Sequence, residues 1–496
     1  LDLFHSSYGA NIDGSLDSRI FLNDGSGTFN ELWPWINPGG DIRTHTLDID
    51  LADFDGAYDL DIFCASRDSQ ARVWLNNCYN GVSDSPFTDI TQQALINQGA
   101  TLTGGNNYEA EFGDLDGDGD FDVWMKNYNG NTDRILRNNG PVGPGGAFTF
   151  NQMNSWIKGD PVVDENEIDF LDYDSDGDLD AFGANFSGTN WLYTGGVAQG
   201  LTGAQGLYHR NGTTAGGALA GWNELPTSGN SSTSLDGECA DMDNDGDPDI
   251  LIANDGGAQN RYFENVLGVP DTHAPTFEQV SSQCDKPEGS STVVHAQVRD
   301  NSAYYVVGYY DVDLIYTVNA GPEQVVDMFS QGGQQFRGVI PSQNGAVAYR
   351  IEATDRTGNT GVSSTQGFVQ NGPVYTNLGF GLPGTNGVPA LSGSGDWSAG
   401  SSGSIVLANA RANAVAGLFV GVNFNPTPAF GGMIVPVPWV GPIILATDGS
   451  GGLTINVSSF PKEIPCGLDV YIQFGIEDPL TPGGVALSNA QHVRTP

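Results

Sequence analysis

The sequence Asp114-Leu-Asp116-Gly-Asp118-Gly-Asp120-Phe-Asp122 places five aspartates at alternate positions of a nine-residue stretch. Carboxylates this close together repel one another, so the pattern indicates a bound cation. Aspartates at positions 1, 3, 5 and 9, with glycine at position 6 for a sharp turn, suit a hard divalent ion that takes about six to eight oxygen ligands. Calcium fits this set of donors best.

The same nine-residue loop recurs along the first half of the chain. Intact copies lie at 172–180 and 241–249, and a degraded copy at 53–61 has Ala57 at position 5 and Tyr58 at position 6. Successive copies are 59, 61, 58 and 69 residues apart when measured between their ninth-position aspartates, which are Asp2, Asp61, Asp122, Asp180 and Asp249. A period near 60 residues is typical of four-stranded propeller blades and is too long for a hexapeptide solenoid.

Each unit also has the same predicted strands around its loop. An alternating strand precedes the loop, an apolar strand such as 123–125 follows it, and a third strand such as 134–138 comes next. A phenylalanine-centred strand closes the unit, at 27–29, 148–150 and 275–277. The units therefore predict a β-propeller of about five blades over residues 1–275. The chain begins at the tail of a motif, so we expect the first blade to lack its inner strand and an upstream piece to precede Leu1.

An EF-hand is the main alternative for the loops. It needs glutamate at position 12 and helices on both sides, whereas position 12 here holds Met125, Gly183 and Ile252 and the flanks read as strands. The EF-hand is therefore excluded.

These loops between strands, followed by N-x-L-x-N-N-like and G-x-F segments, resemble the FG-GAP/VCBS repeats of integrin-α-type β-propellers over about residues 1–282. The resemblance implies that side chains at positions 1, 3, 5 and 9 and the backbone carbonyl at position 7 bind calcium. It implies three intact sites, made by Asp114, Asp116, Asp118, Asp120 and Asp122, by Asp172, Asp174, Asp176, Asp178 and Asp180, and by Asp241, Asp243, Asp245, Asp247 and Asp249. A fourth, weaker site keeps Asp53, Asp55 and Asp61, with Asp59 at position 7.

A second acidic pattern precedes every loop. Acids stand five and three residues before it, as Asp48 and Asp50, Glu109 and Glu111, Glu167 and Asp169, and Asp236 and Glu238. A spacing of two places both acids of a pair on one face of a strand. In a propeller this strand is the innermost, so we predict rings of carboxylates along the central channel that hold cations or ordered water. A polar strand face in a wet channel is the alternative.

The remaining sequence predicts two β-sandwiches. Residues 276–375 hold about seven alternating strands, and their Y-x-I-x-A-x-D-x-x-G-N ending resembles bacterial Ig-like domains of secreted proteins. The glycine-rich residues 376–496 open with Leu378-Gly-Phe-Gly-Leu-Pro-Gly-Thr-Asn-Gly-Val-Pro389, which resembles the start of C-terminal β-domains of some secreted bacterial proteins, and their strands predict a second sandwich. Their apolar stretch 433–444 reads either as core strands or as an exposed patch that docks onto another subunit. The fold class is therefore all-β, a propeller followed by two sandwiches.

Charge and cysteine content narrow the possible partners. Sixty acidic against 18 basic residues give a net charge of −42, which disfavours binding to nucleic acid and to anionic membranes. The most apolar stretch is broken by prolines, so we expect no membrane insertion. The five cysteines allow bridges Cys64–Cys78 and Cys239–Cys284, or no bridge at all.

No nucleophile, metalloprotease or nucleotide-binding motif stands out, so we expect a protein that is not an enzyme. The favoured function is an extracellular, calcium-stabilised structural protein that self-assembles into a surface layer or filament, with copies of itself as partners. A cell-surface adhesin that binds glycans or other surface proteins is the alternative, with 195–221 as a recognition loop. A polysaccharide-active enzyme using two carboxylates is less favoured. Each of these places the protein outside the cell or on its surface.

Overall fold

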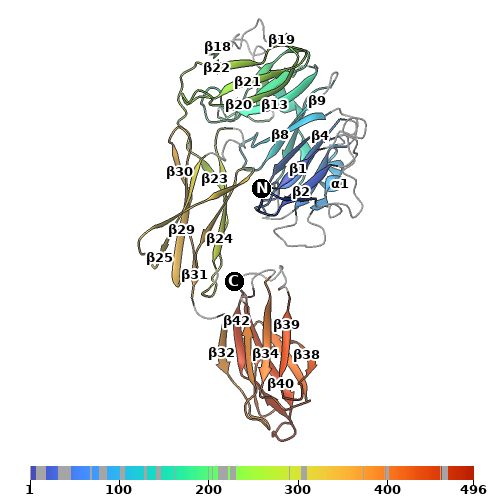
Figure 1. The fold of residues 1–496 in the computed structure, drawn as a ribbon, viewed down its shortest axis with the longest axis vertical. Helices are drawn as coiled ribbons and strands as arrows, with labels where there is room; N and C mark the ends of the chain where they lie inside the picture. The colour runs from blue at the N-terminus through green and yellow to red at the C-terminus, as the bar shows by residue number, and fades with distance from the viewer. Residues whose placement is uncertain are drawn as a thin grey trace.

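The computed structural model describes residues 2–6, 18–31, 46–67, 70–76, 87–100, 107–127, 131–140, 147–160, 162–198, 200–203, 205–210, 222–223, 231–289, 291–302, 310–371, 374–395, 397, 401–458, 460 and 467–495. Within these residues the protein is all-β, as predicted. Three bodies of antiparallel strands follow one another along the molecule (Figure 1). The helical pieces are α1 (Thr91–Ala94), η1 (Ile96–Gln98) and η2 (Asn154–Trp156). None of these described helices is long and apolar enough to cross a membrane.

The described residues up to Asn265 form five larger sheets, which correspond to the predicted units and are antiparallel apart from the parallel pair β12 and β17 in the fourth. The first three sheets are β1 (Leu3–His5), β2 (Arg19–Asn23) and β3 (Phe29–Glu31); β4 (Thr46–Ala52), β5 (Asp61–Ser66), β6 (Arg72–Asn76) and β7 (Phe87–Asp89); and β8 (Asn107–Gly113), β9 (Asp122–Asn127), β10 (Arg134–Asn138) and β11 (Phe150–Gln152). The fourth sheet joins β13 (Glu165–Leu171), β14 (Asp180–Asn185), β16 (Trp191–Thr194), β17 (Tyr208–Arg210) and β12 (Ile157–Lys158). The fifth sheet joins β20 (Ser234–Ala240), β21 (Asp249–Asn254), β22 (Arg261–Asn265) and β18 (Trp222–Asn223), and β15 (Gly188–Thr189) pairs with β19 (Ser231–Ser232).

The strands that precede the loops lie next to one another, an arrangement that the predicted propeller requires of its inner strands. Their acidic side chains accept hydrogen bonds from the backbone of the following inner strand: Ala110 N donates to Asp48 Oδ2 at 3.1 Å, and Ile168 N donates to Glu109 Oε2 at 2.8 Å. Cys239 N donates to Asp169 Oδ2 in the same way. The order β4, β8, β13, β20 is therefore a row of neighbouring strands. The described strands do not establish a closed ring, so the propeller remains a prediction.

The core lies between successive sheets. Phe54 packs edge-to-face on Phe112, with ring centroids 4.9 Å apart, and both belong to a cluster with Phe63 and Phe150 between the second and third sheets. Trp124 continues this packing into the fourth sheet. Burial of each large apolar side chain stabilises the fold by about 1.5–3 kcal/mol. The apolar strand after each loop thus holds consecutive sheets together.

One predicted strand belongs elsewhere. The segment 275–277 was expected to close the last repeat, but β23 (Thr276–Val280) pairs with β24 (Thr292–Arg299), with Phe277 opposite Val298. The outer strand of the fifth sheet is β18 instead, whose Trp222 lies opposite Asn265. Phe277 packs against the core of the following sandwich, and this burial decides which sheet its strand joins.

The second body, called the sandwich below, consists of two sheets that share one hydrophobic core. One sheet has the order β23-β24-β28-β27, with β28 (Gln335–Ile340) and β27 (Phe329–Gly332). The other has the order β26-β25-β29-β30, with β31 also paired to β29, and is built from β25 (Asp311–Val318), β26 (Gln324–Asp327), β29 (Gly345–Thr354), β30 (Thr360–Val362) and β31 (Gln366–Gln370). Buried side chains such as Val294 and Leu314 fill the space between the layers. An Ig-like topology remains a prediction.

The third body holds two larger sheets and a hairpin. Its strands are β32 (Tyr375–Gly379), β33 (Ala390–Ser394), β34 (Gly403–Ala408), β35 (Val415–Gly421), β36 (Phe424–Ala429), β37 (Gly432–Pro436), β38 (Val440–Ala446), β39 (Leu453–Val457), β40 (Asp469–Glu477), β41 (Val485–Leu487) and β42 (Ala490–Arg494).

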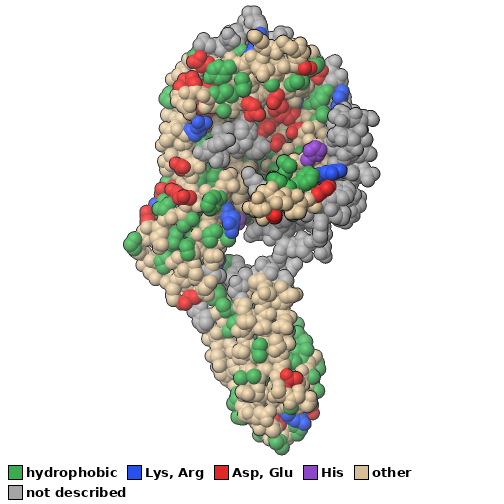
Figure 2. All heavy atoms as spheres, viewed as in Figure 1, with side chains coloured by type: hydrophobic (Ala, Val, Ile, Leu, Met, Phe, Trp, Pro, Cys, Tyr) green, Lys and Arg blue, Asp and Glu red, His purple; other side chains and the backbone are tan. Residues whose placement is uncertain are grey.

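The apolar stretch 433–444 is partly core and partly exposed, so each of its two predicted roles applies to part of it. Ile434 and Val435 are buried, whereas Val440 and Ile444 are 79% and 65% exposed on β38, an edge strand. Hydrophobic side chains line that edge (Figure 2).

The predicted cysteine bridges are wrong. Cys64 and Cys239 are both free and buried, so neither Cys64–Cys78 nor Cys239–Cys284 forms, while Cys284 belongs to another disulfide. Each free thiol sits on a strand that packs into the core, where a small apolar side chain is favoured.

Candidate metal centres

The first aspartate of each loop shapes the turn. In 114–122, Asp114 Oδ1 accepts a hydrogen bond from Asp118 N and Asp114 Oδ2 accepts one from Gly119 N, both at 3.0 Å. The loops 172–180 and 53–61 repeat both bonds, and 241–249 repeats the first. Position 6 has positive φ throughout, with Gly119 at 96°. Glycine adopts this conformation without strain, which explains its place in the pattern.

The ninth aspartate ties the loop to its sheet. Asp122 Oδ2 accepts from Leu115 N at 3.1 Å, and Asp122 Oδ1 accepts from Asn138 N at the end of β10 at 2.8 Å. Asp61, Asp180 and Asp249 make equivalent pairs of bonds. Asn138 also donates from Nδ2 to the carbonyl of Phe54 in the preceding loop, at 3.2 Å. The loops therefore connect neighbouring units as well as neighbouring strands.

The aspartates at positions 1, 3 and 9 converge. In each of three loops, one carboxylate oxygen from each of these positions lies within 4.8 Å of the other two, in the groups Asp53, Asp55 and Asp61; Asp114, Asp116 and Asp122; and Asp172, Asp174 and Asp180. Burial, followed by repulsion from neighbouring carboxylates, raises the pKa of Asp122 well above its ordinary value. The Oδ1 atoms of Asp116 and Asp174 are buried without a hydrogen-bond partner. Such oxygen-only clusters fit calcium, which would bind the converging carboxylates and neutralise them.

The aspartates at positions 3, 5 and 7 of the loop 114–122 have further interactions. Arg137 Nε lies 2.6 Å from Asp116 Oδ2, and its Nη2 contacts Asp118. Burial and the charge of Asp118 raise the pKa of Asp120 to about 8. Arg137, on β10, therefore lies beside the aspartates at positions 3 and 5, where a bound cation would also lie.

The degraded loop 53–61 is covered by the sandwich. Ala57 is 1% exposed, and Tyr58 has φ of 64° at the position where the other loops have glycine. The Tyr58 ring stacks on His295, with centroids 5.5 Å apart. This loop offers three converging carboxylates and lacks the fourth, as the sequence predicted.

A regular contact between the sandwich and the loops escaped prediction. The Oδ2 atom of the first aspartate accepts a hydrogen bond from a sandwich side chain in three loops. The pairs are Gln335 Nε2 to Asp53 at 2.9 Å, Arg299 Nη1 to Asp114 at 3.0 Å, and Asn301 Nδ2 to Asp172 at 2.8 Å. The fourth loop receives Arg356, which donates to Asn244 at 2.9 Å. No local sequence signal marks these donors, because they meet the loops only after two distant modules dock.

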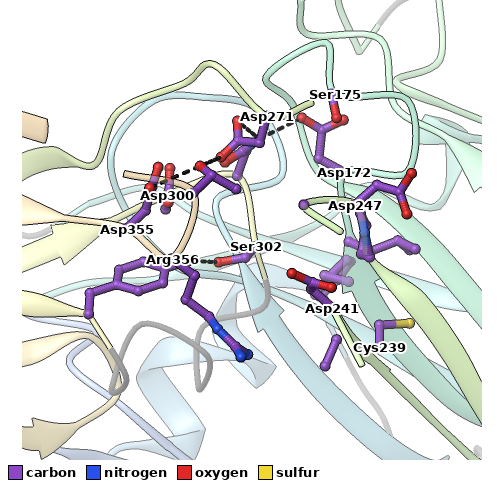
Figure 3. Close-up of a pocket in the computed structure, with 18 residues that line it drawn as sticks. Asp172, Ser175, Cys239, Asp241, Asp247, Asp271, Asp300, Ser302, Asp355 and Arg356 are labelled. Carbon is purple, nitrogen blue, oxygen red and sulfur yellow. Dashed lines mark hydrogen bonds between the residues drawn. The ribbon is translucent and has the colours of Figure 1, made fainter. Parts of the chain in front are cut away.

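A small cavity lies between the loops 172–180 and 241–249 and the sandwich (Figure 3). Its volume is about 80 Å³, and acidic side chains including Asp271 and Asp300 line it. Asn301 Nδ2 donates to both Asp172 and Asp271, and burial together with the charge of Asp271 raises the pKa of Asp300 to about 8. A space of this size holds a few water molecules or an ion rather than an organic substrate.

Two larger hollows open along the same junction. One of about 390 Å³ is lined by Asp114, Asp178, His273 and Arg299 among others. Another of about 840 Å³ lies beside Tyr58 and is lined by amide and hydroxyl side chains of the sandwich.

The predicted recognition segment 195–221 lies partly outside the described residues. Its described part includes β17, which is paired with β16 within the fourth sheet.

Comparison with known proteins gives a family match over part of the chain. The sequence model of the family described as FG-GAP-like repeat matches residues 53–125, which include the first two loops. No curated protein matches the chain. The solved structures with some similarity include a tetra-tandem repeat in the extending region of a large adhesion protein, at 10% identity and a TM-score of 0.20, covering 90% of this chain and 98% of that chain.

Two further solved structures are similar at the same level. The FN1–FN3 domains of chicken CNTN1 share 10% identity at a TM-score of 0.17, covering 50% of this chain and 74% of that chain. A 1.5-MDa bacterial ice-binding adhesin shares 8% identity at a TM-score of 0.15, covering 42% of this chain and 58% of that chain. Scores this low establish no common fold. The chain is therefore similar to FG-GAP-like repeats over the segment that holds its loops 53–61 and 114–122.

Proposed function

We propose that this protein is an extracellular structural protein in which calcium bound at the loops stabilises a β-propeller and fixes its joint with an Ig-like sandwich. The observation that carries the proposal is the shared contact of Asp53, Asp114 and Asp172, whose Oδ2 atoms accept from Gln335, Arg299 and Asn301. The carboxylates of Asp53, Asp114 and Asp172 therefore belong to the converging oxygen clusters of their loops and also accept hydrogen bonds from the sandwich.

Calcium at these loops would act on both modules together. It would be held by the aspartates at positions 1, 3 and 9, and it would supply the positive charge that the crowded carboxylates lack. A loop held in its metal-binding conformation also holds its first aspartate in place for the sandwich donor. Calcium therefore stiffens the connection between modules as well as each repeat, and a rigid rod of modules suits a structural role.

We further propose that copies of the protein assemble through β38 into a surface layer or filament. An edge strand presents unpaired backbone groups that another chain can use, and Val440, Ile443 and Ile444 are 79%, 53% and 65% exposed there. Copies with a net charge of −42 repel one another, and bound calcium reduces this repulsion. Assembly should therefore require calcium.

Light scattering and electron microscopy test the assembly. We expect the wild-type protein to form ordered particles in millimolar calcium and to return to monomers in chelator. Val440→Glu with Ile444→Glu should abolish assembly, whereas Leu480→Glu, which changes a residue that is also 79% exposed, should not. A wild-type protein that stays monomeric in calcium would refute the assembly while leaving the calcium-stabilised joint to be judged by its melting temperature.

An adhesin is the second candidate, and the hollow of about 840 Å³ beside Tyr58 favours it. The side chains of Gln279, Ser363 and Gln366 line this hollow and offer the hydrogen-bonding groups that a glycan needs. A glycan array tests this candidate, with Gln366→Ala as the variant that should lose binding. Chromatography of polysaccharides incubated with the protein tests for cleavage, which we propose does not occur.

A further inference from the structure

Two buried glutamates and one half-buried glutamate meet on the neighbouring strands that precede the loops, away from the loops themselves. Glu109 and Glu111 lie on β8 and Glu167 lies on β13. One carboxylate oxygen from each residue lies within 4.8 Å of the other two. Glu109 and Glu111 are only 7% and 8% exposed. Figure 2 shows acidic side chains gathered over the region where Figure 1 places β8, β13 and β20.

The hydrogen bonds of this cluster leave one oxygen unsatisfied. Glu109 Oε2 accepts from Ile168 N at 2.8 Å, which fixes the Glu109 carboxylate between the two strands. Glu111 Oε1 is buried and accepts no hydrogen bond. A buried polar atom without a partner is costly, by about 1–3 kcal/mol, and calls for a missing ligand.

The neighbouring charges that act most strongly on Glu111 are all negative. Asp48, Asp50 and Asp169 raise the pKa of Glu111, after the larger effect of its burial. Among the residues that the structure describes, no lysine, arginine or histidine forms an ion pair with Glu109, Glu111 or Glu167. Three carboxylates in this setting need either protons or a cation.

We propose that Glu109, Glu111 and Glu167 bind a divalent cation of the calcium class, in a site separate from the nine-residue loops. The donors are all carboxylate oxygens, which hard divalent ions prefer. The site forms between β8 and β13 because the glutamate side chain is longer than that of aspartate and reaches across to the neighbouring strand. β8 carries glutamate at both acidic positions and β13 adds Glu167, whereas β4 carries the shorter Asp48 and Asp50. The cation links the third sheet to the fourth on their inner edges.

Counting bound calcium by isothermal titration calorimetry on the full chain tests the site. Glu111→Gln keeps the size of the side chain and removes its charge, so we expect it to bind one calcium fewer than wild type. Asp174→Ala should remove a different calcium, and the double variant should lack two. Glu238→Gln, which changes the equivalent position on β20, is the matched control and should bind as many ions as wild type.

Shared protons are the competing explanation, and they give a different result. If protons alone hold the cluster together, Glu111→Gln leaves the number of bound calcium ions unchanged, and the proposal is overturned. Diffraction from manganese-soaked wild-type crystals gives a check that needs no variant. We expect an anomalous peak between the three carboxylates, and its absence beside occupied loops would also refute the site.

Discussion

Arg299 and Asp114 lie 185 residues apart in the chain, yet Arg299 Nη1 donates to Asp114 Oδ2 at 3.0 Å. The Arg299 side chain is 7% exposed, and its guanidinium lies 4.6 Å from the centre of the Phe121 ring in the same loop. One sandwich residue therefore contacts both the charged and the aromatic parts of a metal-type loop. This contact makes the joint between modules sensitive to changes in the loop.

Arg299→Met should weaken this joint. It removes the positively charged partner of the Asp114 carboxylate, which keeps only its two backbone hydrogen bonds, and this costs about 1–3 kcal/mol in the free energy of unfolding. We expect a larger loss in chelator than in calcium, because bound calcium gives Asp114 another positive partner. Urea unfolding in both conditions measures the difference. For comparison, Arg356→Met removes only the exposed hydrogen bond to Asn244 and should shift stability by less than about 0.5 kcal/mol.

Removal of calcium should destabilise the repeats. At millimolar calcium and a Kd of about 10⁻⁴–10⁻³ M, each site adds about 0.4–1.4 kcal/mol. Asp174→Ala should lose one such contribution, so its melting temperature should respond less to chelator than that of wild type. Calorimetry measures both proteins, with the exposed Asp255→Ala as control. An equal response of Asp174→Ala and wild type would show that 172–180 holds no structural metal.

Arg137→Leu should strengthen calcium binding at 114–122. The Arg137 guanidinium contacts Asp116 and Asp118, two expected ligands, so calcium must displace it. The first full unit has Leu75 at the equivalent place before Asn76. An ion pair with a partly exposed arginine is worth about 0.5–1 kcal/mol, so the affinity should rise roughly two- to fivefold. Titration calorimetry measures it, and a fall in affinity would mean that Arg137 supports the bound ion.

Asp300→Asn should change how stability depends on pH. Burial and the charge of Asp271 raise the pKa of Asp300 from 3.8 to about 8 in the folded protein. The folded state therefore holds a proton that the unfolded state releases, so stability falls as the pH rises from about 4 to 8. Asparagine removes this loss and should stabilise the protein at pH 8 by about 1 kcal/mol or more. Urea unfolding across this pH range should show no such gain for the exposed Asp311→Asn.

The loops could be predicted because their conformation depends on near neighbours. Asp114 accepts from residues four and five positions later, and Asp122 from one seven positions earlier, so residue type and spacing suffice. Even here one detail was missed: position 4 also has positive φ, and Ser175 and Asn244 adopt it at 55° and 63°. Residues other than glycine can adopt a positive φ when the surrounding hydrogen bonds fix the turn. A search for regular spacing of glycines therefore does not reveal position 4.

Contacts between modules could not be predicted in the same way. Phe277 stands in the same T-F pattern as Phe150, but only burial against the sandwich core decides that its strand pairs with β24. Likewise, Gln335 and Asp53 are separated by 282 residues, and their bond depends on how two folded bodies meet. The stretch 433–444 is apolar throughout, so its composition did not distinguish the buried Ile434 from the exposed Ile444.

The bonds from Gln335, Arg299 and Asn301 to three successive loops also determine how the molecule bears force. A pull between the first and second modules does not pass only through the connecting chain near Pro275, because it is shared by several anchor points spread across the sheets. Each anchor ends on a carboxylate of a calcium-type loop. If calcium binds these loops as proposed, the mechanical strength of the joint would follow the calcium concentration of the surroundings, and the protein would be stiff in calcium-rich water and would yield where calcium is scarce.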